Sequence, residues 1–205
     1  MKSIHKEILS KNQIELLPLI KTFSADFGLV GGTAIALHLG HRRSIDFDLF
    51  TDKDFSNESV RNKIKNDHTI QTTLTVGPDE FTLVTDNVKL TFYKYPYKIN
   101  YSDKFEDIIK TPNLLTLAAM KAFALGRRAK WKDYVDIFFI LKNYAFEDIT
   151  KKSREIFGPE FNERLFREQL SYYEDIDYSE KIDYLDGKEV SDNEIKQKLG
   201  ELSLV

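Results

Sequence analysis

Two adjacent glycines between a predicted strand and a predicted helix constrain the fold of this chain more than any other feature. Residues 27–30 have the apolar composition of a short strand, and residues 33–39 are typical of a short apolar helix. Gly31 and Gly32 let the backbone approach a ligand closely, and the start of the helix turns unpaired N–H groups toward that ligand. The junction predicts a phosphate-binding turn, although glycine pairs also form plain tight turns.

An alternating segment follows the glycine pair. Residues 45–50 alternate apolar and acidic side chains, the period of a strand, which places Asp46 and Asp48 on one face roughly 6–7 Å apart. Two carboxylates held this way beside a core repel each other unless a cation lies between them. Mg²⁺, or Mn²⁺ in its place, suits such oxygen ligands. Because Asp-x-Asp is also common in solvated loops, the prediction of a nucleotide–metal site depends on the acids and the glycines together.

The composition limits the class of protein. The chain has 205 residues, enough for a sizeable core, and a net charge of −3, so any nucleic acid must be bound by a local basic patch. It has no cysteine, which excludes disulfides and thiolate metal sites. Its first residues lack the pattern of a secretory signal, and the longest apolar stretch, residues 114–125, is too short to cross a membrane. We expect a soluble, cytoplasmic protein that does not contact membranes.

The predicted elements change character near residue 105. Before it, a polar helix is predicted at residues 57–66, and turn residues separate three predicted strands at 69–76, 80–85 and 88–95. After it, helices are predicted at 112–125 with Gly126 as the stop, and at 132–143, 151–157, 160–173 and 191–200. The pattern predicts an α+β fold, in which a mixed sheet flanked by helices (residues 1–105) carries a packed helical C-terminal region (residues 106–205).

A single lysine interrupts the most apolar predicted helix. Lys121 is the only charge in residues 114–125, and a buried lysine is costly unless it pairs with a carboxylate or reaches an anion. We expect its ammonium to point at a nucleotide phosphate or at Asp46 and Asp48. The alternative is a snorkelling side chain whose charged end reaches water.

A charged segment follows this helix. Asp133 and Asp136 lie three residues apart and so on one face of the next predicted helix, where Asp133 also suits an N-terminal cap. Asp136 precedes an apolar run, so we expect it to pair with Lys121 or Arg127. Four cations in this segment are candidates for contact with polyphosphate or RNA, unless they form a solvated loop: Arg127, Arg128, Lys130 and Lys132.

These segments resemble a known family. The stretch VGGTAIALHLGHRRSIDFDLF (residues 30–50) closely resembles the first motif of the AbiEii/AbiGii-type nucleotidyltransferase toxins, a branch of the polymerase-beta-like nucleotidyltransferase superfamily. The resemblance continues in VKLTFYKYPY (88–97), resumes in AMKAFAL (119–125) and ends in KDYVDI (132–137). It implies a compact sheet with flanking helices and a helical C-terminal region.

The resemblance also implies a role for each matching position. It places nucleotide phosphates at Gly31, Gly32 and Thr33, and Mg²⁺ at the catalytic acids Asp46 and Asp48. Arg42 and Ser44 match the polar positions just before the acids, and we expect them to bind the nucleotide together with Lys121. Lys121 and Asp136 match a lysine and an aspartate that members of the family require for activity, so both are predicted to be catalytic. It implies a nucleoside triphosphate substrate, a partner antitoxin and, as in some members of the family, a tRNA acceptor. We therefore predict a Mg²⁺-dependent nucleotidyltransferase toxin that moves a nucleoside monophosphate onto an acceptor hydroxyl.

One position departs from the superfamily pattern. The superfamily carries a third carboxylate on a later central strand, but the predicted strand 88–95 contains no acid. Asp136 is then the first candidate for the general base, and it is also a candidate for orienting Lys121. Two alternatives follow: a degenerate fold that binds a nucleotide or a protein partner without turnover, or transfer to a small molecule or a protein hydroxyl.

Overall fold

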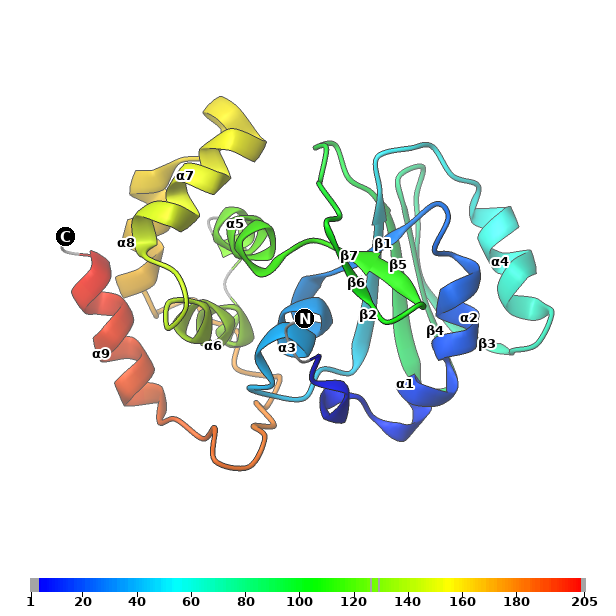
Figure 1. Cartoon of the computed structure of the whole chain (residues 1–205), viewed down its shortest axis with the longest axis horizontal. Coiled ribbons are helices and arrows are strands. Elements are labelled where there is room, and N and C mark those ends of the chain that lie inside the picture. Colours follow the sequence, from blue (N-terminus) through cyan, green and yellow to red (C-terminus); the bar gives the residue numbers. More distant parts are fainter. Residues whose placement is uncertain (1–3, 126, 129, 204–205) are drawn as a thin grey trace.

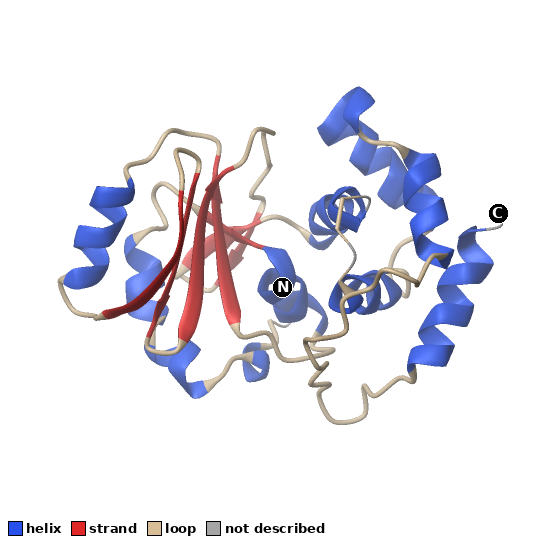
Figure 2. Ribbon diagram, turned by 180° about the vertical axis from the view of Figure 1, so that it is seen from behind, coloured by secondary structure: helices blue, strands red, loops and turns tan. Residues whose placement is uncertain are grey.

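The computed structural model describes residues 4–125, 127–128 and 130–203 (Figure 1). The predicted helix stop at Gly126 lies outside these residues. A five-stranded sheet stands between two groups of helices (Figures 1 and 2). The helices of the C-terminal part of the chain lie on one side of it together with the helix at residues 31–39, and the other N-terminal helices lie on the opposite side. This arrangement confirms the predicted α+β class. In the described part of the chain, no helix has the length and apolar character needed to span a membrane.

The sheet is mixed, and its one parallel pair lies at the centre. Its strands, in the spatial order β1-β2-β5-β4-β3, are β1 Gly28–Val30, β2 Asp46–Thr51, β5 Val88–Lys94, β4 Glu80–Thr85 and β3 Ile70–Val76. β2 and β5 pair in parallel and the other neighbours are antiparallel. Asp86 and Asn87 have φ angles of 47° and 60°, which is the backbone of a tight hairpin turn between β4 and β5. The predicted hairpin is therefore confirmed.

One face of the sheet packs against short N-terminal helices. These are a 3₁₀ turn Lys6–Ile8, α1 Lys11–Glu15, α2 Leu17–Thr22 and α4 Asn57–Lys65. The alternation of β2 turns Phe47 and Leu49 into the core, where both side chains are fully buried. The ring centroid of Phe23, which follows α2, lies 4.8 Å from that of Phe92 on β5. Because these apolar residues occupy one face, Asp46 and Asp48 are left on the other.

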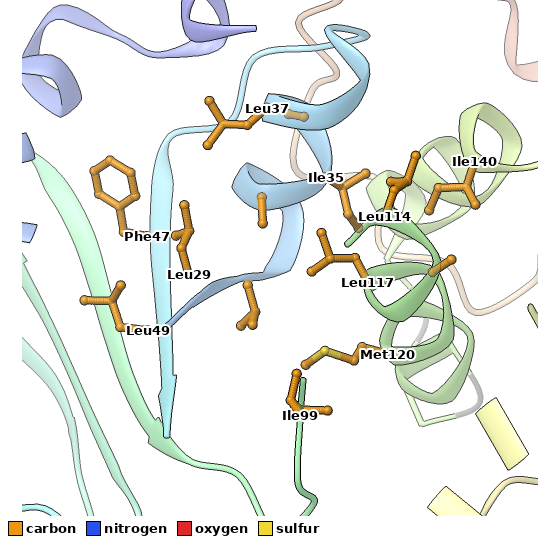
Figure 3. Close-up of a cluster of buried hydrophobic side chains, with 14 of the residues drawn as sticks. Leu29, Ile35, Leu37, Phe47, Leu49, Ile99, Leu114, Leu117, Met120 and Ile140 are labelled. Atoms are coloured by element: carbon orange, nitrogen blue, oxygen red, sulfur yellow. The ribbon is translucent and has the colours of Figure 1, made fainter. Parts of the chain in front are cut away.

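The other face of the sheet meets α3 Gly31–Leu39 and α5 Leu114–Leu125. Figure 3 shows apolar side chains of α3 and α5, among them Ile35, Leu117 and Met120, gathered between the sheet and α6 Trp131–Ile140. The prediction started the first of these helices at residue 33, whereas the structure starts it at Gly31. The two glycines are thus its first turn rather than a loop before it.

The C-terminal region is helical, as predicted, with different boundaries. Its later elements are α7 Phe146–Phe157, a 3₁₀ turn Gly158–Glu160, α8 Glu163–Ser171 and α9 Asp192–Ser203. α7 starts five residues before the predicted 151, because Phe146 and Ile149 are buried and extend its apolar face.

A small hairpin precedes the helical region. It consists of β6 Asp103–Phe105 and β7 Ile109–Thr111, and the sequence did not reveal it. The hairpin runs across the predicted domain boundary between residues 105 and 106, which stays a prediction.

The segment after α8 returns to the loop before β2. The Arg43 N–H donates to the carbonyl of Asp183 at 2.7 Å, and the Leu185 N–H donates to that of His41 at 3.2 Å. Between these bonds, Arg42 forms an antiparallel bridge with Tyr184. These contacts hold residues 183–185 against residues 41–43, which lie far from them in the sequence.

Candidate active site

The glycine turn lies directly against one of the two acids of β2. Gly31 has a φ of +73°, and a Cβ built there would lie 2.1 Å from Oδ2 of Asp48. Only glycine tolerates this backbone together with so close an approach. The start of α3 and the carboxylate of Asp48 therefore face the same space, as the sequence predicted.

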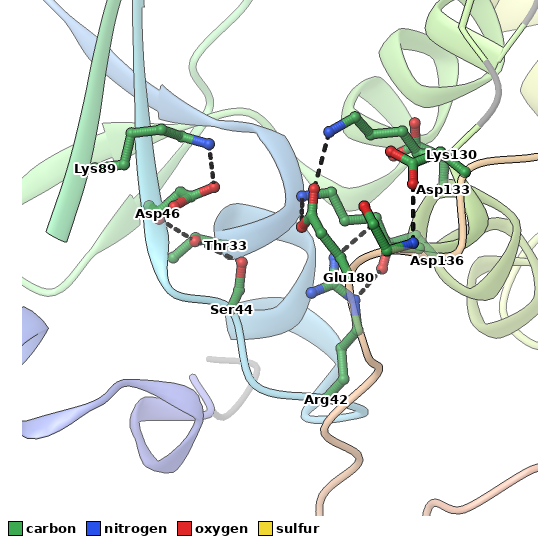
Figure 4. Close-up of polar contacts among 12 residues, drawn as sticks. Thr33, Arg42, Ser44, Asp46, Lys89, Lys130, Asp133, Asp136 and Glu180 are labelled. Atoms are coloured by element: carbon green, nitrogen blue, oxygen red, sulfur yellow. Dashed lines mark hydrogen bonds and ion pairs between the residues drawn. The ribbon is translucent and has the colours of Figure 1, made fainter. Parts of the chain in front are cut away.

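Gly32 makes a second close approach, on the side of Arg42. A Cβ at Gly32 would lie 2.7 Å from Nη2 of Arg42 and 3.5 Å from Oγ of Ser44. The Thr33 hydroxyl donates to Ser44 Oγ at 2.9 Å and also contacts the carbonyl of Asp46 (Figure 4). These contacts connect the first turn of α3 to the start of β2, and they fix the acids relative to the turn.

Asp46 and Asp48 share the polar face of β2 with a lysine from β5. The parallel register places Asp46 opposite Lys89 and Asp48 opposite Thr91. Lys89 Nζ lies 2.6 Å from Asp46 Oδ2 (Figure 4). Burial raises the pKa of Asp48, the charge of Asp46 raises it further, and Lys89 opposes both. The pair therefore carries more negative charge than its surroundings neutralise.

A cavity of about 480 Å³ opens in front of these groups. This volume falls within the range of small-molecule sites. Its lining includes Gly31, Asp48, Lys89, Lys121 and Arg128. It thus brings together the glycine turn, one of the two β2 carboxylates and three cations, and Glu80 of β4 lines it as well. A second cavity of about 460 Å³ lies between α6, α7 and α9, and its lining contains none of the predicted site residues.

Lys121 enters this cavity from a buried ionic network. Its Nζ lies 2.6 Å from Asp133 Oδ1 and 3.0 Å from Asp136 Oδ2, and its side chain is 5% exposed. Arg128 Nε donates to the second oxygen of Asp133 at 2.9 Å. Burial lowers the pKa of Lys121, but the two carboxylates outweigh it and raise the pKa above its ordinary value. The lysine is therefore a fixed positive charge, and the snorkelling alternative does not apply.

Asp136 forms the centre of this network. It accepts hydrogen bonds from Arg42 Nε at 2.8 Å and Nη2 at 3.0 Å, and its Oδ1 lies 2.8 Å from His41 Nε2. Burial alone would raise the pKa of Asp136, yet Arg42 and Lys121 hold it well below its ordinary value. Its carboxylate has no exposed surface. This geometry favours the orientation of Lys121 over acceptance of a substrate proton.

Arg42 and Ser44, which were predicted to bind the nucleotide, lie behind the glycine turn rather than in the cavity. All three guanidinium nitrogens of Arg42 bind protein groups, namely Asp136 and the carbonyl of Arg43. His41 is fully buried beside Asp136 and does not line the cavity. Arg42 thus supports the turn and positions Asp136.

The four cations after α5 are paired with acids. Arg127 lies 3.9 Å from Glu160, Lys130 lies 2.8 Å from Glu180, and Lys132 lies 2.5 Å from the other oxygen of Glu180. Arg128 pairs with Asp133 and lines the cavity. Lys130 and Lys132 hold the pKa of Glu180 at about 2 although burial would raise it. Any phosphate of an acceptor at Lys130 and Lys132 must compete with this carboxylate.

The donor set of β2 fits a hard divalent cation. Asp46 and Asp48 supply oxygen ligands on one face, where Lys89 is in contact with Asp46 alone. Burial, and then the charge of Asp46, raises the pKa of Asp48. Within residues 4–125, 127–128 and 130–203, no group of three or more His, Cys, Asp or Glu side chains is arranged to hold a metal. Two carboxylates are enough for Mg²⁺, because this ion is often bound by one or two carboxylates together with substrate phosphates and water.

Two contributors to the site were missed in the sequence. Lys89 was noted only as a non-acidic residue of its strand, and its contact with Asp46 depends on the parallel register of β2 and β5. Asp133 was taken for a helix cap, but it is fully buried and binds Lys121. The sequence offered one indication that Asp133 binds Lys121. A buried lysine needs a carboxylate partner, and two acids lie three residues apart on the next helix.

Comparison with known proteins decides the family. The model of the family described as "Nucleotidyl transferase AbiEii toxin, Type IV TA system" matches residues 20–199. The chain belongs to this family. It is therefore a nucleotidyltransferase of the toxin type, and membership implies a nucleotide substrate and a cognate antitoxin.

Similar proteins are found in distant bacteria. An uncharacterized protein of Aquifex aeolicus, aq_aa25, is 30% identical over 179 residues, covering 82% of this chain and 84% of that protein. The fold of JHP933 from Helicobacter pylori is similar with a TM-score of 0.58 at 16% identity, over 96% of this chain and 92% of that one. MenT4, a nucleotidyltransferase toxin of Mycobacterium tuberculosis, matches with a TM-score of 0.62 at 13% identity, over 94% and 81% of the two chains. The similarity to MenT4 supports the nucleotidyltransferase fold, and JHP933 has a similar fold.

Proposed function

We propose that this toxin transfers a nucleoside monophosphate from a nucleoside triphosphate to an acceptor hydroxyl of RNA, tRNA being the expected acceptor, with Mg²⁺ or Mn²⁺ as the metal. The bond between the α- and β-phosphates breaks, and pyrophosphate and the proton of the hydroxyl are released. The observation that carries the proposal is the position of Asp48, which lies against Gly31 at the start of α3 and lines the same cavity as Lys121. A phosphate-binding turn, a metal-binding carboxylate and a fixed cation are the groups that phosphoryl transfer requires.

Each group has a separate task in this mechanism. The N–H groups at the start of α3 bind the β- and γ-phosphates, for which Gly31 and Gly32 leave room. Lys121 stabilises negative charge on the phosphates, and Asp133 and Asp136 keep it protonated and in place. A metal bound at Asp46 and Asp48 would neutralise charge at the α-phosphate and lower the pKa of the attacking hydroxyl.

The acceptor is expected on the side of Arg127, Arg128, Lys130 and Lys132. Arg127 and Arg128 have half-exposed side chains, and Arg128 reaches the cavity itself. Phosphates of an RNA acceptor would replace Glu180 as the partner of Lys130 and Lys132, which is a salt-dependent exchange of one anion for another.

A labelling experiment tests the function. The protein is incubated with Mg²⁺ and each α-labelled nucleoside triphosphate in turn, with total tRNA, total protein or buffer as the acceptor, and with Asp46→Ala as the control. Label on tRNA that is absent with Asp46→Ala supports the proposal and identifies the nucleotide. Label on protein alone would overturn RNA as the acceptor. Mg²⁺-dependent nucleotide binding without any transfer would overturn turnover itself.

Two further variants test the acceptor side. Lys130→Gln and Lys132→Gln should weaken binding of the acceptor and leave nucleotide binding unchanged. An equal loss of nucleotide affinity would contradict the assignment of these lysines to the acceptor.

A further inference from the structure

The cavity extends beyond the charged groups into an aromatic half. Phe50 of β2 and Tyr93 and Tyr95, at the end of β5 and just after it, line the cavity on the same side of the sheet as Asp48. The ring centroid of Phe50 lies 5.1 Å from that of Tyr93 and 5.2 Å from that of Tyr95. All three side chains are only partly buried. The aromatic rings are therefore part of the cavity wall and not of the closed core.

From this arrangement we infer that Phe50, Tyr93 and Tyr95 form the seat of the nucleobase, and that Glu80 at its end selects bases that carry an amino group. The inference rests on the proposed function, because it places the triphosphate of the same nucleotide at Gly31 and Asp48.

The distances along the strands suit a nucleotide. Phe50 is two residues beyond Asp48 on β2, and Tyr93 is two residues beyond Thr91 on β5, so their Cα atoms lie roughly 6–7 Å further along the strands than those of the polar pair. A ribose joins the α-phosphate of a nucleotide to its base across a gap of this kind. A triphosphate at the glycine turn thus carries its base to Phe50 and Tyr93.

The opposite wall of the aromatic half is apolar. Leu117, Met120 and Ala124 of α5 line the cavity across from the sheet. A flat base between these side chains and the aromatic rings is enclosed on both faces. Stacking of this type tolerates every base, because each base has a π face, and the thioether of a methionine also packs well against rings. The three aromatic rings by themselves account for binding of a nucleobase and not for selection among the bases.

Glu80 supplies the selectivity. It pairs with Tyr93 in the antiparallel register of β4 and β5, so Phe50, Tyr93 and Glu80 form one row across three strands. The Thr82 hydroxyl donates to Glu80 Oε1 at 2.9 Å, and none of the described Lys or Arg side chains pairs with this carboxylate. Glu80 is thus an oriented hydrogen-bond acceptor at the edge of the seat.

The chemistry of a carboxylate sets the preference. An ionised carboxylate only accepts hydrogen bonds, so it binds the amino group of cytosine or adenine and finds no donor at the matching carbonyl of uracil. Cytosine and uracil have the same size, but cytosine carries an amino group where uracil carries a carbonyl oxygen. The proposal predicts that the protein binds CTP more tightly than UTP.

Calorimetry of the full chain in Mg²⁺ tests the seat without requiring transfer. The probes are the α,β-methylene analogues of CTP and UTP together with inorganic tripolyphosphate, which has no base. The wild type should bind the CTP analogue about tenfold more tightly than tripolyphosphate, because of stacking, and several-fold more tightly than the UTP analogue. In Phe50→Leu, affinity for both analogues should fall about tenfold while that for tripolyphosphate stays unchanged.

Glu80→Gln separates selectivity from stacking. A glutamine amide both donates and accepts, so the ratio of CTP to UTP affinity should fall toward one while stacking persists. Tyr172→Leu, which removes a ring that is 39% exposed and bonded to Asp175 outside the cavity, is the matched control and should change nothing. Tyr93→Leu repeats the stacking test if Phe50→Leu does not fold.

The outcomes that overturn the proposal are separate from those that overturn the function. Equal affinity for tripolyphosphate and both analogues in the wild type, or unchanged analogue affinity in the folded stacking variant, would overturn the seat. An unchanged CTP to UTP ratio in Glu80→Gln would overturn the role of Glu80. A protein that distinguishes CTP from tripolyphosphate but labels no acceptor would keep the seat and overturn the transfer.

Discussion

Two pairs of aspartates flank the cavity, and their surroundings differ. Asp46 and Asp48 lie two apart on β2 and are partly exposed, and Lys89 is in contact with Asp46. Asp133 and Asp136 lie three apart on α6, are fully buried, and are held by three cations and a histidine: Lys121, Arg42, Arg128 and His41. The first pair has one cation for two carboxylates, and the second has more cations than carboxylates.

The opposite directions of the pKa shifts follow from this difference. Burial and Asp46 raise the pKa of Asp48. Burial acts the same way on Asp136, but Arg42 and Lys121 lower its pKa well below the ordinary value. A carboxylate pair that lacks positive charge can accept a metal and a substrate, whereas a pair that is already neutralised can only hold other groups in place. We therefore expect changes in the first pair to affect chemistry and changes in the second to affect folding.

Removal of charge from the β2 pair should have the largest effect. Asp46→Asn and Asp48→Asn should each lower the transfer rate by about 10³-fold or more, which corresponds to roughly 4 kcal/mol, because the metal loses a ligand. Neither variant should unfold at a lower temperature than the wild type, and Asp48→Asn should unfold at a higher one. Rates from a labelling assay and circular dichroism melts measure both properties. Asp54→Asn, an exposed acid paired with Lys94, is the control, and full activity of either site variant would remove the β2 pair from the mechanism.

Asp136→Asn should damage the fold instead. The substitution leaves Arg42 and Lys121 buried without their common partner, and breaking a buried ionic network of this kind costs about 3–5 kcal/mol. The free energy of unfolding in urea measures the loss. Glu201→Gln, which breaks an exposed pair with Lys198, is the control and should leave the free energy of unfolding close to that of the wild type. An Asp136→Asn protein of normal stability would show that the two aspartate pairs do not differ in the way described.

The pH dependence of stability should separate the pairs at a finer level. Folding raises the pKa of Asp48, so its ionised form destabilises the folded state, and Asp48→Asn should be more stable than the wild type at neutral pH. This gain should disappear as the pH falls through the raised pKa toward the ordinary value of 3.8, because the wild-type carboxyl then becomes neutral too.

Asp136 should show the opposite sign. Its folded pKa is lowered, so its contribution to stability is present above 3.8 and is lost only as the pH falls through the folded pKa. The loss of stability in Asp136→Asn should therefore persist at a pH low enough for the gain of stability in Asp48→Asn to have disappeared. Urea titrations at several pH values down to about pH 4 cover this window. Parallel curves for the two variants would contradict the assigned shifts.

The smallest effect concerns Lys89. Lys89→Met removes the cation that competes for Asp46, so affinity for Mn²⁺ should rise roughly two- to fivefold, as expected for a partly exposed ion pair. Titration of Mn²⁺ by electron paramagnetic resonance measures this change, with Lys94→Met as the control on the same strand. A fall in affinity would mean that Lys89 positions Asp46 for the metal and does not compete with it.

The elements of the fold could largely be read from the sequence, because periodicity and turn residues are local properties. The alternation of residues 45–50 and the Asp86–Asn87 turn predicted β2 and the β4–β5 hairpin. The hairpin of β6 and β7 was missed because each strand has three residues, too few to show a period. The start of α7 was misplaced because charged residues interrupt its apolar face.

The site was predictable in its residues and less so in its contacts. The resemblance pointed to Gly31, Asp48 and Lys121, which share the cavity. It could not show that Lys89 lies beside Asp46 or that Glu180 binds Lys130, because both contacts join segments far apart in the chain. Such contacts depend on strand order and on the return of the C-terminal segment, which no local pattern encodes.

The return of that segment has a consequence for when the toxin becomes active in the cell. Residues 183 and 185 bond to the loop at residues 41 and 43, next to the residue that holds Asp136. A ribosome that adds 5–20 residues per second needs on the order of ten seconds to make the intervening chain. The nascent chain cannot form the contacts between these two segments during this interval. We therefore expect a delay between the synthesis of the toxin and its activity, in which an antitoxin already present has time to act.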